Sequence, residues 1–178
     1  MSYKIILLGS LPKGDEARKS FVDWKRAYQE KLSIAMPGAL FLDGDAISDN
    51  VGPELVVGHD LSLLKHADLA IVDASTKIGA GTAQEMMMAK YFAKPLVAIM
   101  PKNTHHRKTD VIFDGILIKD WIHPFLYVCS DFIAETIEEA IPWIQSTKEG
   151  RTQVKDFNIF EEAIEQFERI TPGTIVRP

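Results

Sequence analysis

Two carboxylates near the middle of the chain are candidates for chemistry on a sugar. Glu85 follows the stretch KIGAG and lies near the start of TAQEMMMAKYFAK, whose spacing predicts a helix over Thr82–Lys94. A carboxylate near a helix N-terminus is held ionised, and an ionised, positioned carboxylate is a nucleophile suited to a sugar anomeric carbon. Asp60 could act as a second carboxylate that contacts the sugar or the leaving base.

Both carboxylates also have purely structural interpretations. Thr82 and Glu85 have the spacing of a capping box, in which Glu85 would bond the backbone N–H of Thr82. Such a cap would stabilise the helix by about 1 kcal/mol, and taken alone the motif favours this interpretation. Asp60 lies on the predicted helix Pro53–Ala67, where it could simply face solvent. The residues by themselves leave both alternatives open.

Glycine-containing loops are the second candidate feature. The loop Gly9–Gly14, GSLPKG, could cradle a phosphate with Lys13 adding charge, although a plain turn fits equally well. It is neither a Walker A loop nor a GxGxxG fingerprint. Gly79 and Gly81 would let a backbone approach a ligand closely or would form a tight turn. The candidate substrate-binding residues, all in or beside loops, are Gly9, Ser10, Leu11, Asp43, Asp73, Ser75, Gly79 and Gly81.

Alternating apolar runs and amphipathic stretches must position these residues. The apolar runs predict strands at Lys4–Gly9, Ala39–Asp45, Asp68–Ser75, Pro95–Pro101 and Pro124–Ser130. Helical spacing predicts helices at Asp15–Ala35, Pro53–Ala67, Thr82–Lys94, Asp131–Gln145 and Phe157–Ile170. This order indicates a single α/β domain with about five mostly parallel strands and helices on both faces, Rossmann-like or flavodoxin-like. Ligands of such sheets bind at the carboxyl ends of the strands, where the candidate loops lie.

The bulk composition restricts the classes of function. The chain has 178 residues and a net charge of -5, which argues against binding a nucleic-acid polymer. The single cysteine, Cys129, excludes an intrachain disulfide framework and a cysteine-built zinc site. It is interpreted as a core thiol, with a catalytic thiol as the alternative. No run approaches the roughly 18 apolar residues of a membrane span, so we expect a cytoplasmic protein that does not bind membranes.

Two further motifs keep alternative interpretations. The basic loop Pro101–Lys108, PKNTHHRK, is predicted to be solvated, with a phosphate contact or a dimer contact as the alternative. The adjacent His105 and His106 do not have the spacing of a helical metal-binding pair, and no metal site is predicted. The run Met86–Met88 is more typical of core filling than of a base-binding patch.

Taken together, several stretches resemble the nucleoside 2-deoxyribosyltransferase superfamily, which includes the 2'-deoxynucleoside 5'-monophosphate N-glycosidases. The resemblance is strongest over Gly58–Pro101, which contains the Asp-Leu helix, the "aD...vvD" strand, the glycine turn, and a Glu followed by "xxxA" and a later Lys-Pro. The N-terminal LLGSLPKG is similar to the "GS" loop of the monophosphate glycosidases. Beyond Pro101 the resemblance is poor.

The resemblance implies roles for individual residues. Glu85 would be the nucleophile that forms a glycosyl-enzyme intermediate, Asp60 would help to hold the sugar or base, and Gly9 and Ser10 would lie near the sugar or its 5' substituent. Family members commonly carry a tyrosine in the first strand that orients the nucleophile, whereas this chain has Ile6 there. Tyr3 lies three residues earlier, so strand alternation predicts that it points to the other face.

We therefore predict an enzyme that cleaves the N-glycosidic bond of a nucleoside or nucleoside 5'-monophosphate, expected to be 2'-deoxy. Transfer to a second base and transfer to water both remain open, and no cofactor is expected. The alternative is a non-catalytic nucleotide-binding or sensing module on the same fold, which the missing tyrosine favours. Residues 1–145 are expected to form the α/β domain. Residues 146–178 are expected to form a loop and a helix that packs on that domain or on a partner in a homodimer or higher homo-oligomer.

Overall fold

A twisted parallel sheet organises the chain in a computed structural model that describes residues 2–12, 14–19, 21–46 and 49–171. Its strand order is β2-β1-β3-β4-β7, and every pairing is parallel. The strands are β1 (Lys4–Gly9), β2 (Leu40–Leu42), β3 (Leu69–Asp73), β4 (Leu96–Ile99) and β7 (Phe132–Ala134). The order changes direction between β1 and β3, which in sheets of this type is the point where ligands bind. The predicted α/β class with helices on both faces is confirmed.

Each face of the sheet has its own apolar core because successive strand residues point to opposite faces. Ile6 and Leu8 of β1 pack with residues of α3 (Pro53–His66), α4 (Ala80–Tyr91) and α5 (Pro124–Cys129). Ile5 and Leu7 pack on the other face with α2 (Trp24–Ala35) and α6 (Ile137–Lys148). The strands β3 and β4 are buried along their whole length, which explains their continuous apolar sequences.

The predicted first helix, Asp15–Ala35, is divided in the structure. A short α1 covers Asp15–Arg18, and α2 begins only at Trp24. Asp23 causes this start, since its carboxylate accepts hydrogen bonds from the backbone N–H groups of Lys25 and Arg26 at 3.0 and 3.4 Å. The apolar spacing over Asp15–Ala35 therefore did not reveal the N-cap inside it.

The predicted fifth strand, Pro124–Ser130, is wrong. Its residues form the helix α5, and the fifth strand of the sheet is the next segment, β7. Pro124 occupies the first turn of α5, where its missing N–H costs nothing, and Leu126 and Cys129 are buried three residues apart. A short apolar run does not distinguish a strand from a buried helical turn. Cys129 is a buried core residue, as expected.

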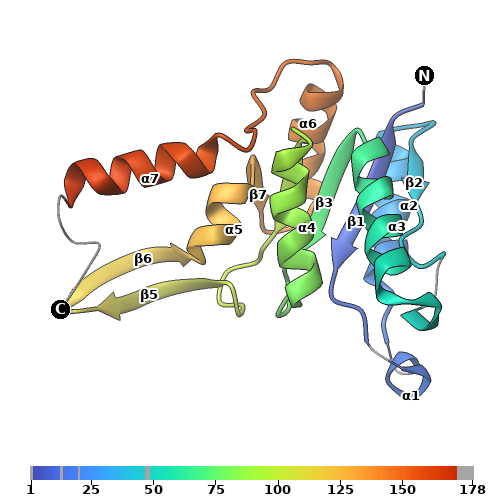
Figure 1. Cartoon of the computed structure of the whole chain (residues 1–178), viewed down its shortest axis with the longest axis horizontal. Coiled ribbons are helices and arrows are strands. Elements are labelled where there is room, and N and C mark those ends of the chain that lie inside the picture. Colours follow the sequence, from blue (N-terminus) through green and yellow to red (C-terminus); the bar gives the residue numbers. More distant parts are fainter. Residues whose placement is uncertain (1, 13, 20, 47–48, 172–178) are drawn as a thin grey trace.

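A β-hairpin and the last helix project from the sheet (Figure 1). The hairpin pairs β5 (Arg107–Phe113) with β6 (Ile116–Ile122), and the sequence prediction missed it because its side chains are largely exposed. The helix α7 (Ile159–Ile170) lies above the hairpin in this view. Phe160, at its start, packs against the core that contains α4 and α5. The short helix η1 (Asp49–Val51) precedes α3.

A candidate active-site pocket beside Glu85

A pocket of about 1090 Å³ extends from the carboxyl end of β1 along the groove between α3 and α4. It contains most of the residues predicted to form the site, namely Gly9, Ser10, Leu11, Asp60, Gly79, Gly81 and Glu85. The wall also carries charged side chains from other elements, namely Arg18, Lys25 and Asp45. The pocket therefore joins a polar region at the strand ends to an apolar region along the two helices.

Glu85 lies in the second turn of α4, one turn further in than the sequence predicts. The helix begins at Ala80, its N-cap is Gly79, and no side chain caps it. Thr82 is therefore a buried residue inside the helix rather than its N-cap. The predicted capping box is wrong, because the N–H of Thr82 is no longer at the N-cap position that the motif requires. This leaves Glu85 without the structural role that competed with chemistry.

The surroundings of Glu85 disfavour its charge. Burial and, to a smaller extent, repulsion from Asp60 raise the pKa of the Glu85 carboxyl from 4.5 to about 7, against the opposing effect of the Lys25 ammonium. No residue in the described part of the chain donates a hydrogen bond to this carboxylate. Carboxylic acids with raised pKa values in a pocket are typical of functional sites. Glu85 is therefore poised between its acid and its ionised form near neutral pH.

Asp60 faces the pocket from α3 rather than lying on a fully solvated helix face. Its side chain is one-third exposed, and its Oδ1 lies 3.1 Å from Nδ1 of the neighbouring His59. The structure thus brings Asp60 and Glu85, which come from separate helices, to one cavity. Two carboxylates in one site can be in different protonation states, because each disfavours the charge of the other.

The loop after β1 is tied to the loop before α4. The hydroxyl of Ser10 donates to the backbone oxygen of Lys77 at 2.6 Å. A Cβ at Gly9 would lie 2.6 Å from Cζ2 of the Trp24 indole, so glycine lets α2 pack closely against the strand end. Gly79 and Gly81 have no atoms near their missing Cβ positions, which leaves their backbone open to the pocket. Lys13, which was predicted to add positive charge to this loop, lies outside the described residues.

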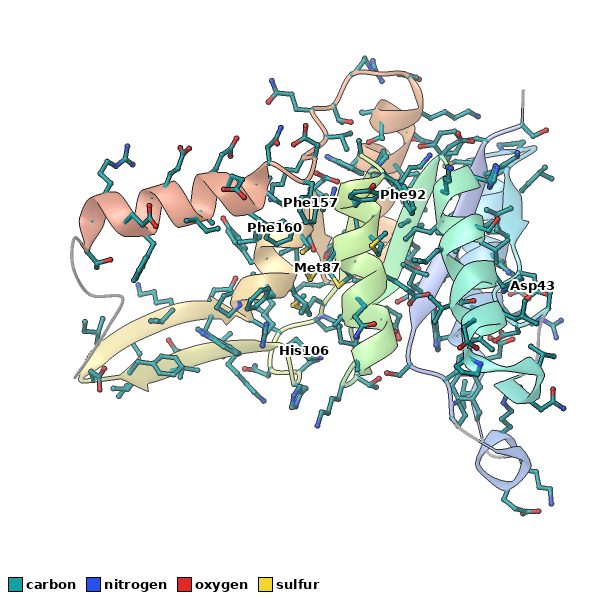
Figure 2. All side chains as sticks on the ribbon, in the orientation of Figure 1. Asp43, Met87, Phe92, His106, Phe157 and Phe160 are labelled. Atoms are coloured by element: carbon teal, nitrogen blue, oxygen red, sulfur yellow. The ribbon has the colours of Figure 1, made fainter. Side chains whose placement is uncertain are left out.

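Three predicted binding residues do not line this pocket. Asp73 points to the other face of the sheet, where Tyr28 of α2 donates to its Oδ1 at 3.0 Å and Ser75 donates to its Oδ2 at 3.1 Å. Asp43 accepts a hydrogen bond from the backbone N–H of Asp45 at 2.9 Å, and in Figure 2 it lies beyond α3, away from Met87 on α4. Asp73, Ser75 and Asp43 thus all form hydrogen bonds with other groups of the protein.

The sequence prediction missed several pocket residues. Lys25 and Arg18 fell inside what was expected to be one continuous helix, so nothing marked them as site residues. The apolar end of the pocket contains Tyr91, from the last turn of α4, and Phe157, from the segment before α7. The rings of Tyr91 and Phe157 meet edge to face with their centroids 6.0 Å apart. No pattern in the sequence connects residues that are so far apart in the chain.

The predictions for the methionine run Met86–Met88 and for the basic loop Pro101–Lys108 are each correct only in part. Met86 is a core residue, whereas Met87 and Met88 line the pocket. His106 of the basic loop is buried and accepts a hydrogen bond from the backbone N–H of Ile78 at 3.0 Å through its Nε2. Burial lowers the pKa of His106 to about 4, so its ring stays neutral and supports the loop that leads into α4. The expectation that this loop is solvated is therefore wrong for His106.

The first-strand position expected to hold a tyrosine is apolar in the structure as well. Ile6 packs on the face of the sheet that carries α4 and lines the pocket. Tyr3 packs on the opposite face, as strand alternation predicts. Neither residue can supply Glu85 with a hydroxyl. Among the described residues, no group of three or more His, Cys, Asp or Glu side chains could hold a metal ion.

Comparison with known proteins gives a likeness in fold. No protein-family model and no curated protein matches the sequence. The 2-desoxiribosyltransferase from Leishmania mexicana superposes with a TM-score of 0.50 at 16% identity, over 82% of this chain and 97% of that one. The chain has the fold of that deoxyribosyltransferase. The resemblance inferred from the sequence is thereby confirmed at the level of fold.

A second solved structure is similar over nearly the same length. The Clostridium botulinum CMP N-glycosidase BcmB superposes with a TM-score of 0.44 at 14% identity, over 80% of this chain and 97% of that one.

No helix among the described residues is long and apolar enough to cross a membrane.

Proposed function

We propose that this protein cleaves the N-glycosidic bond of a nucleoside or nucleoside 5'-monophosphate, with Glu85 as nucleophile. The carboxylate of Glu85 attacks the anomeric carbon of the sugar, so that an O–C bond forms while the bond from that carbon to the base nitrogen breaks. The base leaves with the bonding electron pair and takes up a proton from solvent. Water or a second base then attacks the same carbon, the O–C bond to Glu85 breaks with its electron pair returning to the carboxylate, and the attacking group loses a proton to solvent.

One observation carries this proposal: Glu85, which caps no helix, faces the same pocket as Asp60. A partly buried carboxylate without a hydrogen-bond donor costs stability, and such a group in a pocket is a candidate for a functional role. Asp60 lies where it could hold the sugar or the departing base. The fold shared with a deoxyribosyltransferase supports the same chemistry.

The two regions of the pocket suit the two parts of such a substrate. Polar and charged groups near the strand ends could receive the sugar, and the cation Arg18 could receive a 5'-phosphate. The apolar surface along α3 and α4 could receive the base. We expect a 2'-deoxy sugar from the resemblance to the transferases, and we propose the 5'-monophosphate as the better substrate.

The decisive experiment incubates the protein with deoxynucleosides, ribonucleosides and their 5'-monophosphates, with and without an added free base. Products are separated by chromatography and identified by mass. The proposal requires a free base, or a swapped nucleoside, from the wild-type protein, and none from the Glu85→Gln variant. Undiminished turnover by Glu85→Gln would refute the nucleophile role. The acceptor found in the product distinguishes hydrolase from transferase.

A non-catalytic nucleotide-binding or sensing module is the second candidate, because Ile6 replaces the expected tyrosine. The product assay together with a binding measurement separates the two. Nucleotide binding by calorimetry, with no product from any substrate, would support the sensing module and exclude the enzyme.

We also propose that the chain forms a homodimer or higher homo-oligomer. Within the described residues the β5–β6 hairpin pairs only with itself and exposes Ile112, Phe113, Ile116 and Leu117. The last helix exposes Ile164, Phe167 and Ile170. An isolated hairpin is marginally stable in water, and exposed apolar surface of this kind is typical of an interface. A second copy of the chain is the occupant we propose.

A further inference from the structure

Lys25 lines the pocket that contains Glu85, and packing and an ion pair hold its side chain in place. It lies in the first turn of α2, and its side chain is only 15% exposed. Gly9 makes this position possible, because the absent Cβ lets Trp24, the neighbour of Lys25, pack against the end of β1. The close approach of α2 to the strand end thus places Lys25 in the wall of the cavity that contains Glu85.

An acidic loop holds the Lys25 ammonium in place. Lys25 Nζ lies 2.8 Å from Oδ2 of Asp45, which is 39% exposed. The backbone N–H of Asp45 in turn donates to Oδ1 of Asp43 at 2.9 Å, an arrangement that fixes the turn after β2. Three residues from two segments therefore form a chain of contacts that ends at the pocket. This gives Asp43, which the sequence singled out as a site residue, a supporting role away from the cavity.

Among the described residues, Lys25 is the group whose charge lowers the pKa of Glu85. Besides Glu85 itself, the charged groups that line the cavity in the described part of the chain are Arg18 on α1, Lys25 on α2, Asp45 after β2 and Asp60 on α3. Asp60 raises the pKa of Glu85, and the Lys25 ammonium lowers it. Ile6 supplies no hydroxyl. A nucleophile must be ionised, so an enzyme built on this pocket requires a group that offsets burial and repulsion.

We propose that Lys25 is the positioning residue that favours the ionised form of the Glu85 carboxylate, and that Asp45 holds Lys25 for this purpose. Lys25 thereby replaces, through its charge, the tyrosine that the resemblance leads one to expect in the first strand. This inference rests on the proposed function, because only a nucleophile needs to be ionised. The ionisation of Glu85 can nevertheless be measured without any turnover.

The test is a carboxyl NMR titration of protein labelled with ¹³C in its glutamate side chains. The Glu85 resonance is assigned as the one that disappears in Glu85→Gln. We expect the Lys25→Met variant to titrate at Glu85 about one pH unit higher than wild type, and Lys25→Arg to restore the wild-type midpoint. If Lys25→Met does not fold, Lys25→Gln serves for the same comparison.

Lys31→Met is the matched control. Lys31 lies on the same helix and is also ion-paired, with Glu138, but it does not line the pocket. Its substitution should leave the Glu85 midpoint unchanged. An unchanged midpoint in folded Lys25→Met, or an equal shift in Lys31→Met, would overturn the inference. If the midpoint shifts only in Lys25→Met but no substrate is cleaved, the electrostatic role stands and the proposed function fails.

Discussion

The raised pKa of Glu85 predicts that this residue destabilises the folded protein above neutral pH. The carboxyl has a pKa of about 7 when folded and 4.5 ordinarily. Between these values the folded chain binds more protons than the unfolded chain, so this group's contribution to stability falls as the pH rises. Below pH 4.5 both states are protonated and the contribution vanishes. Above pH 7 both states are ionised and the full cost is present.

The size of the cost follows from the same two values. At 1.36 kcal/mol for each pKa unit, the difference between 4.5 and about 7 corresponds to about 3 kcal/mol. Because Glu85 is only partly buried, solvent screening reduces this to about 1–3 kcal/mol. The Glu85→Gln substitution keeps the shape of the side chain and removes the charge. It should therefore raise the free energy of unfolding by this amount at pH 8.

The assay is urea unfolding of wild type and Glu85→Gln at pH 8 and at pH 5, followed by circular dichroism. The gain in stability should be large at pH 8 and much smaller at pH 5. Glu165→Gln, at an exposed position on α7, is the control and should change little at either pH. A loss of stability at pH 8, or a gain that does not depend on pH, would refute the reasoning.

Two further predictions concern other parts of the fold. Lys90 is fully buried and ion-paired with Asp131, so Asp131→Ala should lower the free energy of urea unfolding by about 3–5 kcal/mol. Glu30→Ala, which breaks the exposed Arg26 pair, should cost under about 1 kcal/mol, and similar losses in both variants would contradict this. Light scattering should show wild type as a dimer or larger, and Ile116→Lys should lower its mass. A monomeric wild type would exclude the proposed assembly.

Local chemistry made the layers of the fold predictable. The continuous apolar runs of β1, β3 and β4 indicate strands buried on both faces, and the longer runs between them have helical spacing. The same reasoning failed where the local signal was ambiguous. The six residues of α5 read as a strand because a short apolar run has no clear period. The hairpin was missed because exposed strands lack the apolar alternation that burial imposes.

The sequence by itself determined which groups are available at the carboxyl ends of the strands, including Glu85, Asp60 and the glycines around them. Only the tertiary structure decided what these groups do. It moved the start of α4 to Ala80, which removed the cap at Glu85, and it turned Asp73 to the opposite face. It also brought Lys25 from a different helix to the same cavity. Spacing along the chain specifies local geometry, whereas burial and charge at a site depend on contacts between distant segments.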